Sequence, residues 1–373
     1  MTLGAVRRPV LASVAALALL FGADALLFRT PLYPSYLEPD SSTGLFELIL
    51  AKERRAQERL GDNVVVTLGD SRLAYYPRVA NELTSETGYV FRNAGVAGSD
   101  PRLWYYMLRD LDPTARRYRA IVLAVSDYDD EDVPWDFTDG IRDLHYAVAR
   151  LRLSDAFDFA SSFPRPALQW EAFRGALLKG TVYQADMEAF LAHPLKRIDY
   201  VHLCRQGYEG WTYGFQESPR SLEGLRIDWS RWSFTAPPSV DAGQRLSVEL
   251  SLMYRPAPQT GVFAAFRRQW FGRILERYRG SPTRIVFVRL PRGPIPRPQN
   301  LVRKRSASVR ELAGRPGVVL ADEHAFDVLE RPELFKDAQH LNHEGCSRLS
   351  AMLAREVSRL LAGVVEKRPG GSL

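Results

Sequence analysis

The chain has few residues of the kinds that hold metals or form disulfides. Only two of its 373 residues are cysteine and six are histidine. Cys204 and Cys346 lie far apart and fit no metal-ligand spacing, which argues against a cysteine-rich metal centre. Two states of these thiols remain open: one disulfide outside the cytoplasm, or two buried free thiols.

An excess of charge of one sign is also missing. The chain has 50 basic and 44 acidic residues, mixed along its length, and a net charge of +6. This mixture indicates a mildly basic, solvated surface, and no nucleic-acid-binding motif accompanies it. The sequence therefore gives no basis for a nucleic-acid partner.

Long apolar runs are absent except near the N-terminus. The run Val10 to Phe28 contains one charge, Asp24, and follows Arg7 and Arg8. About 20 apolar residues cross a bilayer as a helix, and basic residues before them favour a cytoplasmic N-terminus. A cleaved signal peptide is the alternative, because Ala23-Asp24-Ala25 resembles a cleavage site. The run continues to Phe28, however, which favours an uncleaved anchor.

We therefore expect a single-pass protein of the cytoplasmic membrane whose remaining chain is extracytoplasmic. Residues 1–29 form the anchor or signal segment, and the proline-rich residues 30–43 indicate a linker. Residues 44–366 predict a folded domain with an insertion at about 128–261, and residues 367–373 predict a disordered tail.

Within that domain, short β-branched or apolar runs alternate with helical patterns. Such alternation predicts an α/β fold with a mainly parallel sheet. The expected strands are residues 63–68, 89–92, 120–125, 283–290 and 317–321. The expected helices outside the insertion are residues 45–60, 101–111, 300–313 and 344–365.

The insertion interrupts this alternation. Residues 141–194 indicate helices, whereas residues 195–260 are irregular and rich in aromatic residues. We expect the insertion to lie over the carboxyl edge of the sheet, where open α/β sheets bind ligands. Aromatic side chains stack on sugars or acyl chains, although most large aromatics belong to a core. The aromatic residues concerned are Trp211, Tyr213, Phe215, Trp229 and Trp232.

Two short motifs carry candidate chemistry. The first, Gly69-Asp70-Ser71, follows the first predicted strand, where a tight turn exposes a serine hydroxyl at the sheet edge. A serine that caps the next helix is the alternative. The second motif has Asp337 three residues before His340, a spacing that lets the carboxylate orient the imidazole. A helix-capping loop is the alternative there, and His343 is a rival base without such a partner.

Together these motifs resemble the first and last conserved blocks of the SGNH (GDSL-like) hydrolase superfamily, in the same order along the chain. The resemblance implies a three-layer, flavodoxin-like α/β/α fold, with Ser71 as nucleophile and Asp337 and His340 as its partners. It also implies an oxyanion hole formed by the backbone N–H groups of Ser71 and Gly95, because Arg92-Asn93-Ala94-Gly95 follows the second strand. No metal or organic cofactor is expected.

One block departs from the family pattern. After the third strand the family commonly has Gly-x-Asn, and the asparagine completes the oxyanion hole. This chain has Ser126-Asp127 there, and an aspartate repels an oxyanion. Asp127 is thus a possible third-block position, and either another donor serves or its carboxylate points elsewhere.

The resemblance extends to membrane-anchored members linked to exopolysaccharide O-acetylation. It implies a serine-dependent esterase or O-acyltransferase that acts on an envelope polysaccharide or another acyl ester, with a membrane-bound O-acyltransferase as a possible partner. Transfer is favoured over hydrolysis, because a tethered site lies near polymer assembly and a large insertion can exclude water. The alternative is a catalytically inactive relative that binds or scaffolds an envelope polymer.

Overall fold

The computed structural model describes most of the chain, which forms two compact units. The helical unit comprises Met1–Lys52 and Thr138–Gly210, and the α/β unit comprises Glu53–Phe137 and Trp211–Leu373. The predicted tail, residues 367–373, lies outside the described residues. These are residues 3–57, 61, 63–73, 75–130, 141–207, 216–253, 261–298, 301 and 306–366.

A five-stranded sheet with the order β2-β1-β3-β6-β7 forms the centre of the α/β unit, and each neighbouring pair is parallel. The residues of β1 and β3 are buried on both faces, which explains their unbroken apolar runs. The α/β class with a mainly parallel sheet is thus confirmed. The strands are β1 (Val64–Leu68), β2 (Val90–Asn93), β3 (Ala120–Val125), β6 (Arg284–Arg289) and β7 (Val318–Leu320).

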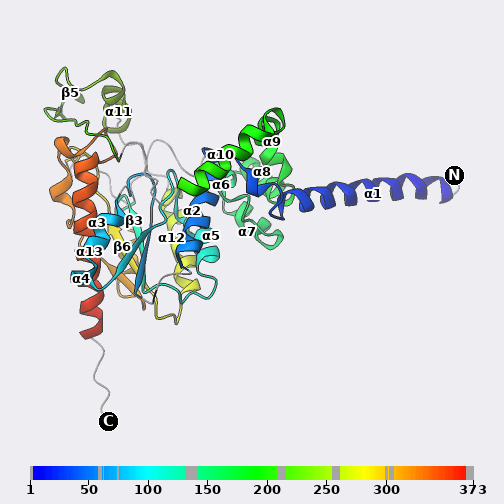
Figure 1. Cartoon of the computed structure of the whole chain (residues 1–373), viewed down its shortest axis with the longest axis horizontal. Coiled ribbons are helices and arrows are strands. Elements are labelled where there is room, and N and C mark those ends of the chain that lie inside the picture. The colour runs from blue at the N-terminus through cyan, green and yellow to red at the C-terminus, as the bar shows by residue number, and fades with distance from the viewer. Residues whose placement is uncertain are drawn as a thin grey trace, which may run out of the picture. The chain divides into compact units, whose positions relative to one another are not determined.

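Helices cover both faces of this sheet (Figure 1). On one face, Val122 and Val286 belong to a buried cluster with Leu353 of α13. On the other face, Phe287 packs edge-to-face on Phe271 of α12, with ring centroids 5.0 Å apart. The first face carries α3 (Pro77–Glu82), α4 (Thr84–Thr87) and α13 (His343–Glu366), and the second carries α5 (Pro101–Leu111) and α12 (Val262–Arg277).

The insertion does not form one lid, because its two halves belong to different units. The first half joins the helical unit with α1 (Leu3–Phe28), the linker and most of α2 (Ser42–Gln57). It contains α6 (Arg142–Ala147), η2 (Leu153–Asp155), α7 (Ala156–Ser161), α8 (Pro166–Leu177), α9 (Gly180–Ala192) and α10 (Pro194–Gly207).

The second half belongs to the α/β unit and is more regular than expected. It forms a small hairpin of β4 (Arg226–Asp228) and β5 (Ser233–Thr235), followed by α11 (Ala242–Leu252). Trp229 packs against the core of this unit, and the Trp232 ring lies edge-to-face on the Trp229 ring. The other three aromatic residues, Trp211, Tyr213 and Phe215, lie outside the described residues.

The expected linker packs within the helical unit. Tyr33 and Leu37 are buried. The Arg29 guanidinium donates to the Ala176 carbonyl at 2.7 Å, and Arg197 pairs with Glu38 at 2.8 Å. Proline residues here stiffen the 3₁₀ turn η1 (Pro34–Tyr36) and do not mark a free tether.

The helix expected over residues 300–313 is wrong for its described part. Ser306 pairs with Asp130 as an isolated bridge, and only the 3₁₀ turn η5 (Arg310–Leu312) follows. The Asp130 carboxylate accepts hydrogen bonds from Ser306 Oγ at 2.6 Å and from Ser308 N at 2.8 Å. These contacts draw the segment out of a helical path.

The two thiols are free and lie in different units. Cys204 is half-buried on α10. Cys346 is fully buried at the start of α13, and its burial raises the pKa of the thiol to about 12. Of the two states left open by the sequence, the structure shows unpaired thiols.

Helix α1 is long and apolar enough to cross a membrane, a test that a signal sequence also passes. Its single acidic residue, Asp24, is only 7% exposed. The Asp24 carboxylate accepts hydrogen bonds from the backbone N–H groups of Gly180 at 2.7 Å and Lys179 at 3.2 Å. It therefore satisfies N–H groups at the N-terminus of α9.

Lys179 is itself buried, and its ammonium group donates to the Ala149 carbonyl at 2.9 Å. Burial lowers the pKa of Lys179 from 10.5 to about 8. The folded chain thus releases this proton at a lower pH than the unfolded chain does. Between about pH 8 and pH 10.5 Lys179 is protonated in the unfolded chain and neutral in the folded chain, so its contribution to stability rises with pH.

We predict that Lys179 contributes about 3 kcal/mol of stability to the helical unit over this pH range, and that Lys179→Met removes this contribution. Unfolding followed by circular dichroism in detergent, at a series of pH values, measures the effect. The exposed Lys196 provides a matched control, since Lys196→Met leaves the pH dependence unchanged. An unaltered pH dependence in Lys179→Met would contradict the assignment.

Candidate functional site

Ser71 lies on the turn that follows β1. A side chain at Gly69 would place its Cβ 2.8 Å from Leu73 Cβ and 3.1 Å from Ala124 Cβ, so this turn requires glycine. The next helix, α3, begins only at Pro77, so Ser71 does not cap it. The Ser71 hydroxyl is half-buried at the carboxyl edge of the sheet.

The structure brings Ser71, His340 and Asp337 together. Ser71 Oγ lies 2.9 Å from His340 Nε2. The other ring nitrogen, His340 Nδ1, lies 2.9 Å from Asp337 Oδ2 and 3.0 Å from Oδ1. In this arrangement Nδ1 donates to the carboxylate and Nε2 is available to accept the serine proton.

A tight loop before α13 fixes the Asp337 carboxylate. Asp337 Oδ1 accepts hydrogen bonds from the backbone N–H groups of Gln339 and His340, each at 2.9 Å. Lys336 N donates to the His340 carbonyl at 2.9 Å and closes the loop. The residues on either side, Phe335 and Leu341, pair as an antiparallel bridge.

Electrostatics keep this carboxylate charged. Burial opposes ionisation of Asp337, but the hydrogen bond and charge of His340, with two backbone N–H groups, outweigh it. The pKa of Asp337 is held below its ordinary value. An ionised Asp337 stabilises a protonated imidazole at His340.

Helix α11 supports the loop of Asp337 and His340 through hydrogen bonds. The sequence analysis did not predict this contact. Gln244 Nε2 donates to the Lys336 carbonyl at 2.6 Å, and Ala338 N donates to Ser247 Oγ at 3.2 Å. Gln339 donates to Ser251 Oγ at 3.2 Å. A capping-box pattern, Asp241 with Gln244 three residues later, marks the start of α11 and was the available signal.

The expected oxyanion donor Gly95 is already engaged. Its N–H donates to Asn93 Oδ1 at 2.8 Å, because the asparagine side chain folds back over the turn after β2. In the same loop, Val96 N and Ser99 Oγ both donate to the Gly69 carbonyl at 3.0 Å. These two bonds attach the loop to the turn that holds Ser71.

Gly98 lies three residues after Gly95 in this loop. Its backbone has φ +72°, a left-handed conformation that favours glycine. Within the described part of the chain, the N–H groups of Gly98 and Ser71 have no hydrogen-bond acceptor. The sequence signal for Gly98 is a second glycine in Gly95-Val-Ala-Gly98.

Asp70 does not face the serine hydroxyl. Its carboxylate accepts from the backbone N–H of Arg72 at 2.9 Å and from Arg72 Nε at 3.1 Å. Burial opposes ionisation of Asp70, but the Arg72 guanidinium outweighs it and, with a smaller contribution from His340, lowers the pKa of Asp70. This pair holds the turn around Ser71.

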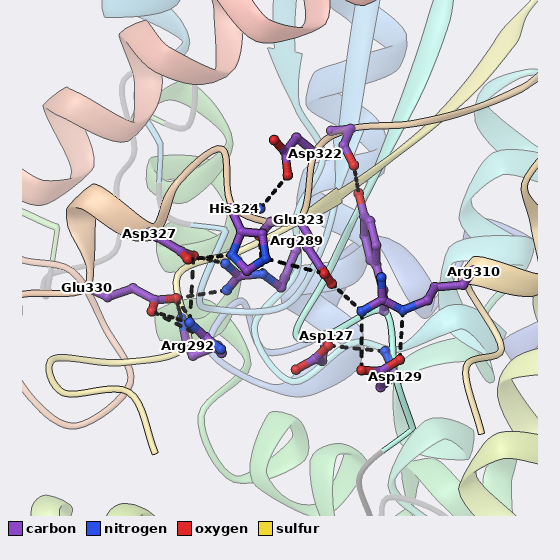
Figure 2. A network of polar contacts seen from close by, with 12 residues as sticks. Asp127, Asp129, Arg289, Arg292, Arg310, Asp322, Glu323, His324, Asp327 and Glu330 are labelled. Carbon is purple, nitrogen blue, oxygen red and sulfur yellow. Dashed lines mark hydrogen bonds and ion pairs between the residues drawn. The ribbon is translucent and has the colours of Figure 1, made fainter. Parts of the chain in front are cut away.

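The contacts of Asp127 lie outside the triad. Asp127 Oδ1 accepts from the backbone N–H of Asp129 at 3.1 Å (Figure 2), and its backbone carbonyl accepts from Arg267 at 2.7 Å. No contact joins it to Ser71 or His340 among the described residues. The turn therefore uses the carboxylate to fix its own backbone, and Asp127 contributes no oxyanion donor.

An ion-pair network occupies the neighbouring part of the sheet edge, after β3, β6 and β7 (Figure 2). Arg289 and Glu330 pair at 2.8 Å, both almost fully buried. Removing one partner of such a pair costs about 3–5 kcal/mol. The network thus fixes the loops beside the site. Its other labelled members are Asp127, Asp129, Arg292, Arg310, Asp322, Glu323, His324 and Asp327.

The rival base, His343, lies elsewhere. Its Nδ1 is 3.1 Å from the Tyr76 hydroxyl and 3.6 Å from Glu217, at the start of α13. The ranges that the structure describes hold no cluster of three histidine, cysteine or acidic residues able to bind a metal ion.

The sequence was compared with known proteins. No protein-family model matches the chain, and no curated protein matches it significantly.

Proposed function

We propose that the chain is a serine-dependent acyl-ester enzyme of the SGNH type. The observation that carries the proposal is the chain of hydrogen bonds from Ser71 Oγ through His340 to Asp337. The strand order supports it, because the five strands in chain order follow the 2-1-3-4-5 arrangement of flavodoxin-like sheets. The resemblance of the two motifs to the family's first and last blocks adds to it.

In the proposed mechanism, Ser71 Oγ attacks the carbonyl carbon of an acyl ester while His340 Nε2 takes the hydroxyl proton. Asp337 stabilises the imidazolium. Collapse of the tetrahedral intermediate expels the alcohol, which takes the proton from His340 and leaves an acyl-serine. An incoming hydroxyl or water then loses its proton to His340 and attacks the acyl group, and Ser71 Oγ leaves and takes that proton back from His340.

The proposed oxyanion donors are the N–H groups of Ser71 and Gly98. Ser71 and Gly98 follow β1 and β2 respectively and have no acceptor for these N–H groups among the described residues, whereas the Gly95 N–H donates to Asn93. A preorganised amide directed at the developing charge contributes a few kcal/mol. Gly98 thus offers a donor in a chain where Asp127 replaces the family's asparagine.

The proposed location is the outer face of the cytoplasmic membrane, with α1 as a retained anchor. Cleavage after Ala25 would remove Asp24, the acceptor for the N–H groups of Lys179 and Gly180. Arg7 and Arg8 before the span favour a cytoplasmic N-terminus. A tethered site favours acyl, especially acetyl, transfer to an envelope polysaccharide, with a membrane-bound O-acyltransferase as the proposed donor-side partner.

A non-catalytic scaffold that binds an envelope polymer is the second candidate, and the aspartate at position 127 favours it. A fluorophosphonate probe separates the two functions, because it phosphonylates only an activated serine.

We predict that the probe labels the full-length protein in detergent at Ser71, and that Ser71→Ala abolishes labelling. Asp337→Asn and His340→Gln slow it about 10³–10⁴-fold, because the base is misoriented or lost. Peptide mapping by mass spectrometry locates the adduct. His343→Gln is the matched control and is labelled at the wild-type rate. If substitution of Asp337 or His340 did not change the labelling rate, the result would contradict the enzyme and favour the scaffold function.

We predict that Gly98→Ala lowers turnover of a small acetyl ester about 10²-fold, because alanine at a left-handed φ displaces the donor amide. Gly88 has the same φ of +72°, at the end of α4. Gly88→Ala therefore imposes comparable backbone strain and leaves turnover near wild type once folding is verified. Equal losses in both variants would refute the donor role.

We predict that a small acetyl ester, supplied with oligosaccharide acceptors, yields acetylated sugar in a Ser71-dependent reaction. Tethering favours an acceptor found at the envelope over water. Chromatography with mass spectrometry measures how product divides between acetylated sugar and free acetate. If free acetate were released quantitatively and no acceptor changed its yield, the result would refute transfer and support hydrolysis.

A further inference from the structure

The length of α1 determines how deep its last turn lies. The last charged residue before the apolar run is Arg8, and about 20 residues separate it from Arg29. At 1.5 Å per residue these residues span about 30 Å, the thickness of a hydrocarbon core. A span that stopped before Asp24 would reach only about 22 Å. The last turn, Asp24 to Phe28, is therefore needed to cross the membrane.

That same turn is enclosed by the helical unit. Asp24 and Phe28 are 7% and 4% exposed, although most of the stretch Leu11–Phe28 is exposed. The Phe28 ring lies 5.3 Å from the Tyr183 ring on α9, and Asp24 binds Gly180 N at 2.7 Å. The start of α9 thus lies beside a part of α1 that a full span places within the membrane.

Segments around the end of α1 present large apolar side chains to the outside. Leu32 follows α1 directly and is 54% exposed. Leu153 on η2, Phe157 on α7 and Trp170 on α8 are 60%, 75% and 65% exposed. We call these four residues the collar patch. Such a group on one small unit indicates an interaction surface.

The Arg29 side chain attaches the segments that carry Leu153 and Trp170 to the end of α1. The Arg29 guanidinium donates to the Ala176 carbonyl at 2.7 Å and the Leu177 carbonyl at 3.0 Å, at the end of α8. It also reaches the Leu151 carbonyl at 3.5 Å, just before η2. Figure 1 shows α8 and α9 beside the C-terminal end of α1.

The occupant that fits this surface is the lipid bilayer. Leu26 and Leu27 on the last turn of α1 are 59% and 42% exposed, and Leu32 follows within one turn. A bilayer that covers Leu26 and Leu27 next meets Leu32, the first residue of the collar patch. Tryptophan and phenylalanine are also the residues that membrane interfaces favour.

We propose that the helical unit is a membrane-embedded collar, whose collar patch contacts the headgroup and upper acyl region of the lipid. This inference rests on the proposed membrane span of α1. The unit then holds the end of α1 at a fixed depth, and the buried Asp24 meets backbone N–H groups and not lipid. The first half of the insertion therefore serves attachment to the membrane.

The test uses the full-length protein reconstituted in vesicles of phosphatidylcholine and phosphatidylglycerol that carry bromine close to the acyl carbonyl or near the chain end. Bromine quenches tryptophan fluorescence only in contact. We expect bromine near the carbonyl to quench Trp170 more strongly than bromine near the chain end. Trp170→Phe removes more than half of that quenching.

Trp229→Phe, which removes a partly buried tryptophan of the α/β unit, is the matched control and leaves the quenching in place. Quenching of Trp170 by aqueous iodide and not by bromine would overturn the collar. Shielding from both quenchers would indicate a protein partner and would also overturn it. Resistance of the protein to alkaline carbonate extraction tests the α1 span separately, so failure of the span and failure of the collar are distinguishable.

Discussion

The candidate site depends on one hydrogen bond that joins residues 269 positions apart, between His340 Nε2 and Ser71 Oγ at 2.9 Å. Ser71 is held by the first strand and His340 by the loop before the last helix. The parallel sheet makes this meeting possible, because it brings the carboxyl ends of its strands to one edge. The α11 brace and the Asp70–Arg72 pair then hold each partner in place.

Polar groups at this edge are satisfied mainly by the protein itself. The Gly95 N–H donates to the Asn93 side chain, and the Asp129 N–H donates to the Asp127 carboxylate. Arg289 forms an ion pair with Glu330. The N–H groups of Ser71 and Gly98, two half-buried residues, are exceptions, since neither has an acceptor within the described residues. This contrast is the reason that we propose these two amides as the oxyanion donors.

The helical unit follows a different constraint. An acid on an apolar helix needs partners, and Asp24 finds them in the backbone at the start of α9. That contact makes a segment more than 150 positions away part of the same unit as the N-terminal helix. The insertion is accordingly divided, with one half beside α1 and the other half bracing the loop of Asp337 and His340.

The sequence alone determined the five strands, the helix Pro101–Leu111, the long terminal helix and the positions of Ser71, Asp337 and His340. Unbroken β-branched runs and strong helical periodicity are local signals that neighbouring residues express by themselves. Tertiary structure decided the rest, because it depends on partners distant in the chain. Ser306 bonds to Asp130 and does not join the predicted helix, the Gly95 N–H donates to Asn93, and Gly180 N at the start of α9 donates to Asp24. None of these hydrogen bonds produces a periodic pattern in the sequence.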